Sequence, residues 1–365
     1  MVYSSSLALG LLDFNDANYY VSRQTIWAAI GVGLLVSLMR LDYHWLRSVS
    51  PLLMLAAIVS LTAVLVPGIG LERNGATRWI ALGPLPPVQP SEFAKLALII
   101  YVAAWLAAKG GDVRSFALGF VPFVLMVGLV AGLILLEPDT GTATVLVLTT
   151  ITLFFVAGAS VTHIAALLGI GGVAMTLLIL TSGYRLDRLM AYLRAEDDPT
   201  GLGFQTIQLL IALGSGGING LGLGASRQKF FYIPGSHTDG VFAVVGEELG
   251  FIGAMGVVLL FVALVYRGFR VVFRARDDFG ALLATGIICW ISFQALINVG
   301  GITRAIPLTG IPMPFLSYGG SALAALLAAV GILLSVSRHA TGAPPLDAAD
   351  ESNSKPRSQR RRGAR

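Results

Sequence analysis

A carboxylate stands where a polar segment meets an apolar one, in the sequence His237-Thr238-Asp239. After Gly240, an apolar run begins at Val241. A carboxylate that is partly removed from water at such a boundary has a raised pKa, which suits a general base working near neutral pH. Asp239 is therefore the leading candidate for a catalytic base, whereas His237 alone is better explained by a structural role.

Two further carboxylates lie close together in the segment Glu137-Pro138-Asp139-Thr140-Gly141. The connection between the flanking apolar stretches is so short that both must lie near a membrane face. Paired carboxylates could hold a divalent cation, which prefers hard oxygen ligands. Asp139 followed by Thr140, Gly141 and a long apolar run also fits a helix N-cap. The sequence leaves both interpretations open.

A third group of polar residues contains Arg78 and Trp79 and continues to Glu92 and Lys95. Glu92 and Lys95 are three residues apart, so they share one face of a helix that enters the bilayer. Ionisable groups at such depth are costly and commonly mark function. The alternative is an aromatic interface anchor, a local ion pair and a helix start at Ser91.

The longest polar segment, 183–244, carries Arg188 and Lys229 among several other basic residues. Arginine recognises phosphate in a bidentate manner, and glycine-rich turns such as Gly214-Ser215-Gly216-Gly217 expose N–H groups to an anion. These residues suit an anionic headgroup, although each taken singly could be a solvated loop charge.

A proline-rich segment, 307–321, follows Arg304 and ends at Ser321. Its three prolines within eight residues exclude an ordinary helix. Irregular backbone at membrane depth is tolerated only where it packs in protein or lines a cavity. We therefore expect this segment to form part of a site wall.

The elements that must position these groups are membrane helices. Of the 365 residues, 55% are hydrophobic and 12% are charged, and the mean hydropathy is +0.78. A helix needs about 20 apolar residues to cross the hydrocarbon core. Nine stretches approach or exceed this length: 25–41, 50–67, 92–108, 115–136, 142–158, 163–182, 245–267, 280–299 and 320–337. The sequence predicts an all-α polytopic membrane protein.

Basic residues occur in every second short connection, which the positive-inside rule places in the cytoplasm. Those connections contain Arg40 and Arg47, then Lys109 and Arg114, then four arginines of the segment 267–276. The segments 68–91, 137–141, 183–244 and 300–319 are then extracytoplasmic, so every polar group described above lies on one side. The sequence predicts a transmembrane domain over 25–338 with 183–244 as its large outer loop.

The two ends of the chain fall outside this domain. Residues 1–24 are expected on the outer side as the remnant of a further helix, since Leu7 to Leu12 is too short to span. Residues 339–365 combine Pro, Ser, Asp and Arg and are expected to form a disordered basic cytoplasmic tail.

Composition also excludes some classes of function. The single cysteine, Cys289, allows no disulfide framework and no cysteine metal site. The net charge of +5 arises largely from cytoplasmic-type loops and the arginine-rich tail, so it does not indicate nucleic-acid binding.

At these residues the chain resembles the SEDS family (shape, elongation, division and sporulation), ten-helix membrane proteins that polymerise the bacterial cell wall. The resemblance covers nearly the whole chain, and the family's motifs stand in order: NGATRWI, QPSEFAK, EPDTGTA, ALGSGG, SRQKFFYIP, HTDGVFAVVGEELG and PLTGIPMPFLSYGGS. SRQKFFYIP and YRLDRL are more similar to the cell-division member than to the elongation member.

The resemblance implies a peptidoglycan glycosyltransferase that joins lipid II units on the outer face of the bacterial cytoplasmic membrane, at the division septum. It implies an essential Asp239 and a divalent cation, Mg²⁺ or Mn²⁺, for which Glu137 and Asp139 are the candidate ligands. The expected substrate-binding residues are Arg78, Trp79, Lys95, Arg188, Lys229, His237, Thr238 and Ser321. The expected partners are lipid II, a class B penicillin-binding protein and other divisome membrane proteins.

Two departures from the family pattern adjoin Asp239. Gly240 replaces the usual Phe after the HTD motif, and Gly235 replaces an acidic residue after the Pro of SRQKFFYIP. A lipid II flippase and a scaffold without chemistry are the alternative functions. A flippase needs polar groups on both faces, whereas the motifs here lie on one. The small residues of 280–299 and 320–337, among them Gly286, Gly320 and Gly331, could contact the partner in lipid, and the alternative is that they pack only against other helices of this chain.

Overall fold

The computed structural model describes residues 1–340 except 74, 84, 230–232 and 234. Most of the predicted disordered tail, 341–365, lies outside the described residues. Residues 339 and 340 belong to the last helix instead.

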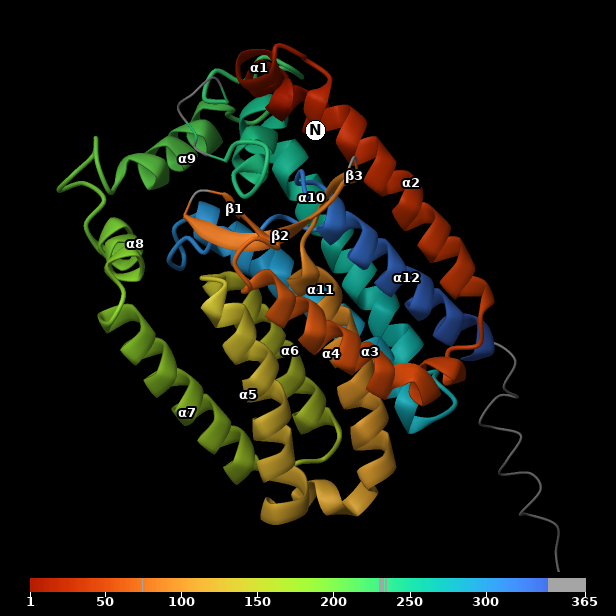
Figure 1. Ribbon diagram of the computed structural model, residues 1–365. Coiled ribbons are helices and arrows are strands. Elements are labelled where there is room, and N and C mark those ends of the chain that lie inside the picture. Colours follow the sequence, from red (N-terminus) through yellow and green to blue (C-terminus); the bar gives the residue numbers. More distant parts are fainter. Residues whose placement is uncertain (74, 84, 230–232, 234, 341–365) are drawn as a thin grey trace, which may run out of the picture.

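Long apolar helices form the body of the molecule (Figure 1). Within the described residues, eight helical segments are long and apolar enough to cross a membrane. They contain α2 (Tyr19–Arg40), α3 (His44–Val64), α4 (Pro90–Lys109), α5 (Val121–Leu136), α7 (Val161–Leu180), α10 (Val241–Val272), α11 (Asp278–Ile302) and α12 (Gly320–Ala340). The all-α polytopic membrane fold is thereby confirmed. The remaining predicted crossing corresponds to α6 (Thr140–Val156), which has only 17 residues.

Short polar side chains and proline set where several of these helices begin. Asp139 accepts a hydrogen bond from the Thr142 N–H at the start of α6, and Asp277 accepts one from the Gly280 N–H at the start of α11. Pro90 occupies the first turn of α4, where its missing N–H leaves no hydrogen bond unmade. Between α4 and α5 the chain passes through η1 (Gly110–Arg114) and η2 (Phe116–Phe120).

The bundle packs around α4 and α11, whose side chains are mostly buried. A Cβ on Gly286 would come within 2.6 Å of Ile99, and one on Gly331 would come within 2.6 Å of the Leu35 carbonyl oxygen. At the start of α12, a Cβ on Gly320 would collide with the Trp27 ring. These three glycines therefore serve contacts within the chain, as the alternative to a partner surface predicted.

One end of the bundle, called here the sheet end, carries short elements that the sequence did not predict (Figure 1). Segment 68–91 contains an antiparallel sheet of β1 (Gly70–Arg73), β2 (Ala76–Leu82) and β3 (Leu85–Val88), in the order β1-β2-β3. Segment 183–244 contains α8 (Gly183–Leu193) and α9 (Phe204–Ser215). Residues 1–24 form α1 (Val2–Phe14) and the beginning of α2.

The long helix α10 is broken at Gly250, whose φ of 67° and ψ of −167° are accessible essentially only to glycine. Loop 216–222 supplies the hydrogen bonds that the break removes from the helix. Four backbone hydrogen bonds join this loop to α10. Before the break, Leu221 N donates to Glu247 O (3.0 Å) and Gly222 N to Glu248 O (2.9 Å); after it, Phe251 N donates to Gly217 O (2.9 Å) and Ile252 N to Ile218 O (3.2 Å). The part of α10 before the break thus forms one unit with this loop.

Candidate active site

Residues 235–240 form a compact turn at the sheet end, immediately before α10. The N–H groups of Thr238 and Gly240 both donate to the Gly235 carbonyl, at 2.9 and 3.0 Å. The Thr238 hydroxyl donates to Asp239 Oδ1 at 2.9 Å. Gly240, not Asp239, is the N-cap of α10, and no side chain caps this helix within the described residues. The Asp239 carboxylate is therefore not committed to holding the helix.

The two glycines that depart from the family pattern are the first and last residues of this turn. Gly235 has a φ of +70°, and a Cβ on it would lie 2.2 Å from Asp239 Oδ1. A Cβ on Gly240 would lie 2.8 Å from Ile233 Cγ2. The departures consequently allow the chain to close tightly beside the carboxylate.

The proline-rich segment, expected to form part of a site wall, holds the turn from the other side. Tyr318 N–H donates to the His237 carbonyl (2.8 Å), and the Ser317 hydroxyl donates to the Thr238 carbonyl. The Asn298 amide donates both to the Asp239 carbonyl (2.9 Å) and to the Ile311 carbonyl (2.8 Å). One side chain of α11 thus fixes the turn and the proline-rich segment together.

The surroundings of Asp239 shift its acidity. Burial raises the pKa of the carboxyl, while the Thr238 hydroxyl, the backbone N–H of Asp239 and the Arg188 guanidinium oppose that shift. Arg188 lies 4.7 Å from the centre of the Tyr184 ring and donates to the Leu308 carbonyl at 3.1 Å. A carboxylate with a raised pKa and a cation nearby is suited to accept a proton.

The start of α6 gathers residues from three other parts of the chain. The Arg78 guanidinium donates to the carbonyls of Glu137 (3.0 Å) and Pro138, and Arg185 Nε donates to the Thr140 hydroxyl (3.3 Å). Gln89 connects this region to α12, because its N–H donates to Ser321 Oγ at 3.0 Å and its amide donates to Asp139 at 3.4 Å. The separate sequence motifs therefore meet at the sheet end.

Glu137 and Asp139 have different environments. Asp139 caps α6 and also accepts from the Thr142 hydroxyl (2.9 Å). Glu137 is fully buried, and neither of its side-chain oxygens has a hydrogen-bond partner among the described residues. Burial, reinforced by the Asp139 charge and opposed by Arg78, raises the pKa of Glu137 to about 8. A carboxyl that favours its neutral form is a poor metal ligand.

Within the described part of the chain, no group of three or more His, Cys, Asp or Glu side chains could hold a metal ion. Of the two candidate ligands, Asp139 already caps a helix, and Glu137 favours its protonated form. These carboxyls therefore do not fit a preformed cation site, and the divalent cation stays a prediction.

The two predicted substrate-binding lysines are buried in ion pairs. Lys95 Nζ lies 3.0 Å from the Glu92 carboxylate, 3.2 Å from Gln294 Oε1 and 5.0 Å from the centre of the Trp290 ring. Lys229 Nζ lies 2.8 Å from Glu248 Oε1. Both lysines are at least 95% buried, so neither ammonium group faces open space in this structure.

Trp79 is half-buried on β2, opposite Leu71 of β1. Sequence reasoning missed Asn298 and Gln294, and the Gln294 amide donates to the Pro312 carbonyl at 3.0 Å. Gln294 and Asn298 are amide residues four positions apart in an apolar helix, and polar residues at that depth commonly have a function. That signal was available in the sequence.

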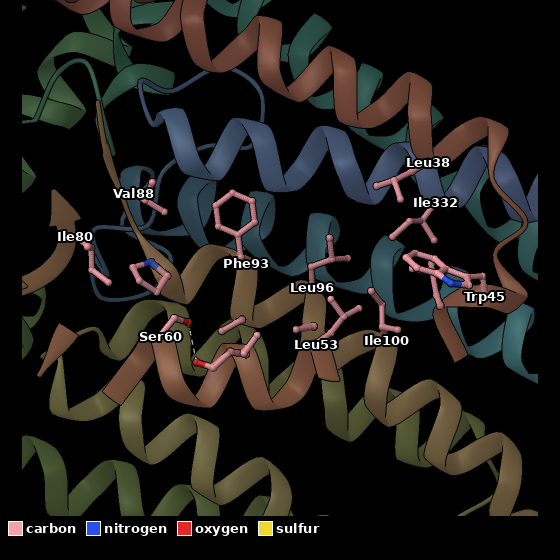
Figure 2. A pocket seen from close by; sticks show the side chains of 16 residues that line it. Leu38, Trp45, Leu53, Ser60, Ile80, Val88, Phe93, Leu96, Ile100 and Ile332 are labelled. Carbon is pink, nitrogen blue, oxygen red and sulfur yellow. Dashed lines mark hydrogen bonds between the residues drawn. The ribbon is translucent and has the colours of Figure 1, made fainter. Parts of the chain in front are cut away.

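An apolar groove of about 480 Å³ runs along the bundle between α3, α4 and α12. Figure 2 shows Ile80 and Val88 of the sheet near one end, Trp45 near the other, and Phe93 between them. The lining is almost entirely apolar, so the groove suits a hydrocarbon chain.

Comparison with known proteins decides the family. The FtsW/RodA/SpoVE family model, described as cell cycle protein, matches residues 1–342. The chain belongs to the FtsW/RodA/SpoVE family. The SEDS resemblance inferred from the motifs is thereby confirmed.

Relatives in this family align with most of their own length. The chain is 46% identical over 339 residues to stage V sporulation protein E of Bacillus subtilis, covering 93% of this chain and 92% of that protein. It is 45% identical over 342 residues to the probable peptidoglycan glycosyltransferase FtsW of Trichlorobacter lovleyi, covering 92% and 88%.

Solved structures share the fold. A structure described as coordinating polymerization and crosslinking in a peptidoglycan synthase complex matches with a TM-score of 0.73 and 30% identity, over 94% of this chain and 97% of that one. The crystal structure of the rod-shape-determining protein RodA of Thermus thermophilus matches with a TM-score of 0.65 and 29% identity, over 92% and 94%.

Proposed function

We propose that this protein is a peptidoglycan glycosyltransferase that polymerises lipid II into glycan strands during septal cell-wall synthesis. The observation that carries the proposal is the Asp239 carboxylate, which is fixed by a tight turn but is not used to cap α10. The names of the FtsW relatives support the same activity.

The reaction needs a proton acceptor at the attacking hydroxyl. A sugar hydroxyl of one lipid II attacks the anomeric carbon of another, and a new C–O bond forms. The bond from that carbon to the pyrophosphate oxygen breaks, and its electron pair leaves with the lipid pyrophosphate. Asp239 takes the hydroxyl proton, and its raised pKa makes it a stronger base than an ordinary aspartate.

The leaving pyrophosphate needs positive charge beside it. Arg78 and Arg188 are half-buried at the sheet end, and their described hydrogen bonds go to backbone carbonyls. Each guanidinium has five N–H donors, more than those bonds use. The remaining donors are available for bidentate contact with phosphate oxygens.

The substrate's hydrocarbon tail needs an apolar path beside this site. The groove lined by Phe93 and Leu96 starts at Ile80 and Val88 of the sheet, so a lipid anchored there has its headgroup at the sheet end. A divalent cation at the pyrophosphate is part of the proposal. Its test is polymerisation before and after chelation, with Mg²⁺ or Mn²⁺ restored.

The protein is a multi-pass membrane protein, and we propose that it resides in the bacterial cytoplasmic membrane at the septum with its C-terminus in the cytoplasm. The positive-inside rule supports this orientation. A topology reporter fused after Arg276 is expected to report the cytoplasm, and one near Ser226 the outside. A cytoplasmic signal near Ser226 would remove Asp239 from the side where lipid II is polymerised.

The proposed partner is a single-pass class B penicillin-binding protein, together with other divisome membrane proteins. A polymerase that leaves uncrosslinked strands requires a transpeptidase nearby. The structural neighbour described as a peptidoglycan synthase complex supports this pairing. Copurification of the two full-length proteins from membranes tests it, and separation in mild detergent at equal expression would contradict it.

The deciding experiment is polymerisation of purified lipid II by the purified protein, alongside lipid II translocation in vesicles. Glycan chains from the wild type and none from Asp239→Ala support the glycosyltransferase. Translocation without polymerisation would support a flippase instead. Neither activity, with retained division-partner binding, would support a scaffold.

A further inference from the structure

Two adjacent carboxylates on α10, Glu247 and Glu248, hold the loop that precedes the Asp239 turn. Both residues are almost completely buried. Glu247 accepts hydrogen bonds from the Ser226 hydroxyl (2.5 Å) and the Arg227 N–H (2.9 Å). The Glu247 carboxylate thereby holds two consecutive residues of the loop, Ser226 and Arg227.

Glu248 holds the same loop through a buried ion pair that α1 completes. Glu248 Oε1 accepts from Lys229 Nζ (2.8 Å) and from the Ser4 hydroxyl (2.6 Å). Lys229 Nζ also donates to Ser4 Oγ (3.0 Å) and to the Gly224 carbonyl (2.7 Å). An ammonium group has three donors, and these contacts hold it inside the protein.

Contacts continue from this pair to the Asp239 turn. Ile233 N–H donates to the Gln228 carbonyl at 3.1 Å, beside Lys229. Ser236, which is fully buried, donates to the Ser5 carbonyl of α1 at 3.5 Å. Helix α1 therefore contacts the loop at the ion pair and again inside the turn.

We infer that Ser4, Lys229 and Glu248 are positioning residues, which set the Asp239 turn without touching the substrate. The inference rests on the proposed glycosyltransferase function. It reassigns Lys229, which the sequence alone placed on the pyrophosphate, to a structural ion pair that links α1, the loop and α10.

A double-mutant cycle separates the two roles. Removing one member of a buried ion pair leaves an unpaired buried charge, whereas replacing both by apolar residues of similar size is often nearly neutral. Lys229→Met and Glu248→Met have suitable volumes. If the pair positions the turn, each single variant is worse than the double variant, and the two changes are strongly non-additive.

The experiment measures kcat and KM for lipid II polymerisation, and hydrogen exchange of residues 233–240, on the full-length protein. We expect each single variant to lose about tenfold or more in kcat and the double variant to recover to within about threefold of wild type. The rate of hydrogen exchange in residues 233–240 should rise in the single variants and fall again in the double variant. Arg227→Met is the matched control, because among the described residues Arg227 contacts Glu247 through its backbone N–H, which the substitution keeps.

Two outcomes would overturn the assignment. A raised KM with unchanged kcat in Lys229→Met, together with normal kinetics in Glu248→Met, would place Lys229 on the substrate. Unchanged exchange of residues 233–240 in both single variants would also contradict positioning. A wild type that makes no glycan would refute the proposed function, while the exchange cycle would still test the positioning.

Discussion

Two aspartates stand at the starts of two helices in nearly the same local sequence, and they are used differently. In Asp139-Thr140-Gly141 the aspartate is the N-cap of α6, and its oxygens accept from the N–H and hydroxyl of Thr142. In Thr238-Asp239-Gly240 the glycine is the N-cap of α10. The Asp239 carboxylate accepts from the Thr238 hydroxyl beside it.

The order of residues therefore decides whether a carboxylate stabilises a helix or remains available for chemistry. An N-cap aspartate is stabilised as an anion by N–H groups and the helix dipole. Moving the carboxylate one position earlier removes it from those groups, and burial then raises its pKa.

Replacing each aspartate by asparagine gives the largest expected contrast. Asp239→Asn keeps the shape but not the basicity, so we expect polymerisation to fall by about 10²- to 10⁴-fold, the range for loss of a general base. Asp139→Asn retains an acceptor for the cap and should stay within a few-fold of wild type. Equal losses in the lipid II assay would remove the distinction between the two sites.

Gly235→Ala tests whether the Asp239 turn needs its tight closure. A Cβ would approach Asp239 Oδ1 within 2.2 Å at a φ of +70°, so the carboxylate must move. Because small displacements of a catalytic group are costly, we expect kcat to fall by about tenfold or more. Gly68→Ala is the control, since Gly68 also has a positive φ but no neighbour within 4 Å. If Gly235→Ala and Gly68→Ala lose similar activity, the cause is backbone strain and not the contact with Asp239.

Asp139→Ala tests the capping half of the comparison. Loss of an N-cap costs about 1 kcal/mol of stability, so thermal unfolding in detergent should occur at a lower temperature, with polymerisation reduced only in proportion to folded protein. Ser160→Ala is the matched control for loss of an N-cap, because the Ser160 hydroxyl accepts from the His163 N–H at the start of α7. A specific activity that collapses in Asp139→Ala alone would show that Asp139 also acts in the reaction.

Arg188→Met should make the smallest change to the contrast between the two aspartates, a shift in the pH profile. The Arg188 charge lowers the pKa of Asp239 against the effect of burial. Without that charge the pKa rises further, so the ionised base forms at higher pH. The rising limb of kcat against pH should move to higher pH, and kcat at high pH should also fall, because Arg188 is proposed to contact the leaving pyrophosphate. A rising limb that moves to lower pH would contradict the assignment of Asp239 as the base.

The sequence predicted the membrane helices well because nine apolar stretches leave the backbone no alternative to helix in lipid. It did not predict the sheet, because β3 contains Pro86 and Pro87, which are typical of turns or strand edges. It missed the break at Gly250 for a related reason, since a glycine inside an apolar run is compatible with a continuous helix.

The candidate site was predictable where a residue's position along the chain determines its environment. Asp239 and the proline-rich segment are such cases. The ion pair of Lys95 with Glu92 is local and is the alternative that the sequence left open, whereas the role of Lys229 depended on partners far away in sequence, Glu248 and Ser4. A basic residue in a motif looks the same whether it binds phosphate or a buried carboxylate, so residue type alone could not separate these roles.

The break in α10 has a consequence for how the protein is made. Glu247 and Glu248 carry carbonyls whose described partners are the N–H groups of Leu221 and Gly222. Unpaired carbonyls are costly in hydrocarbon. The first part of α10 therefore reaches a stable arrangement only after loop 216–222, synthesised earlier, lies beside it on the same side of the membrane. Correct placement of one segment thus becomes a condition for the stable insertion of the next.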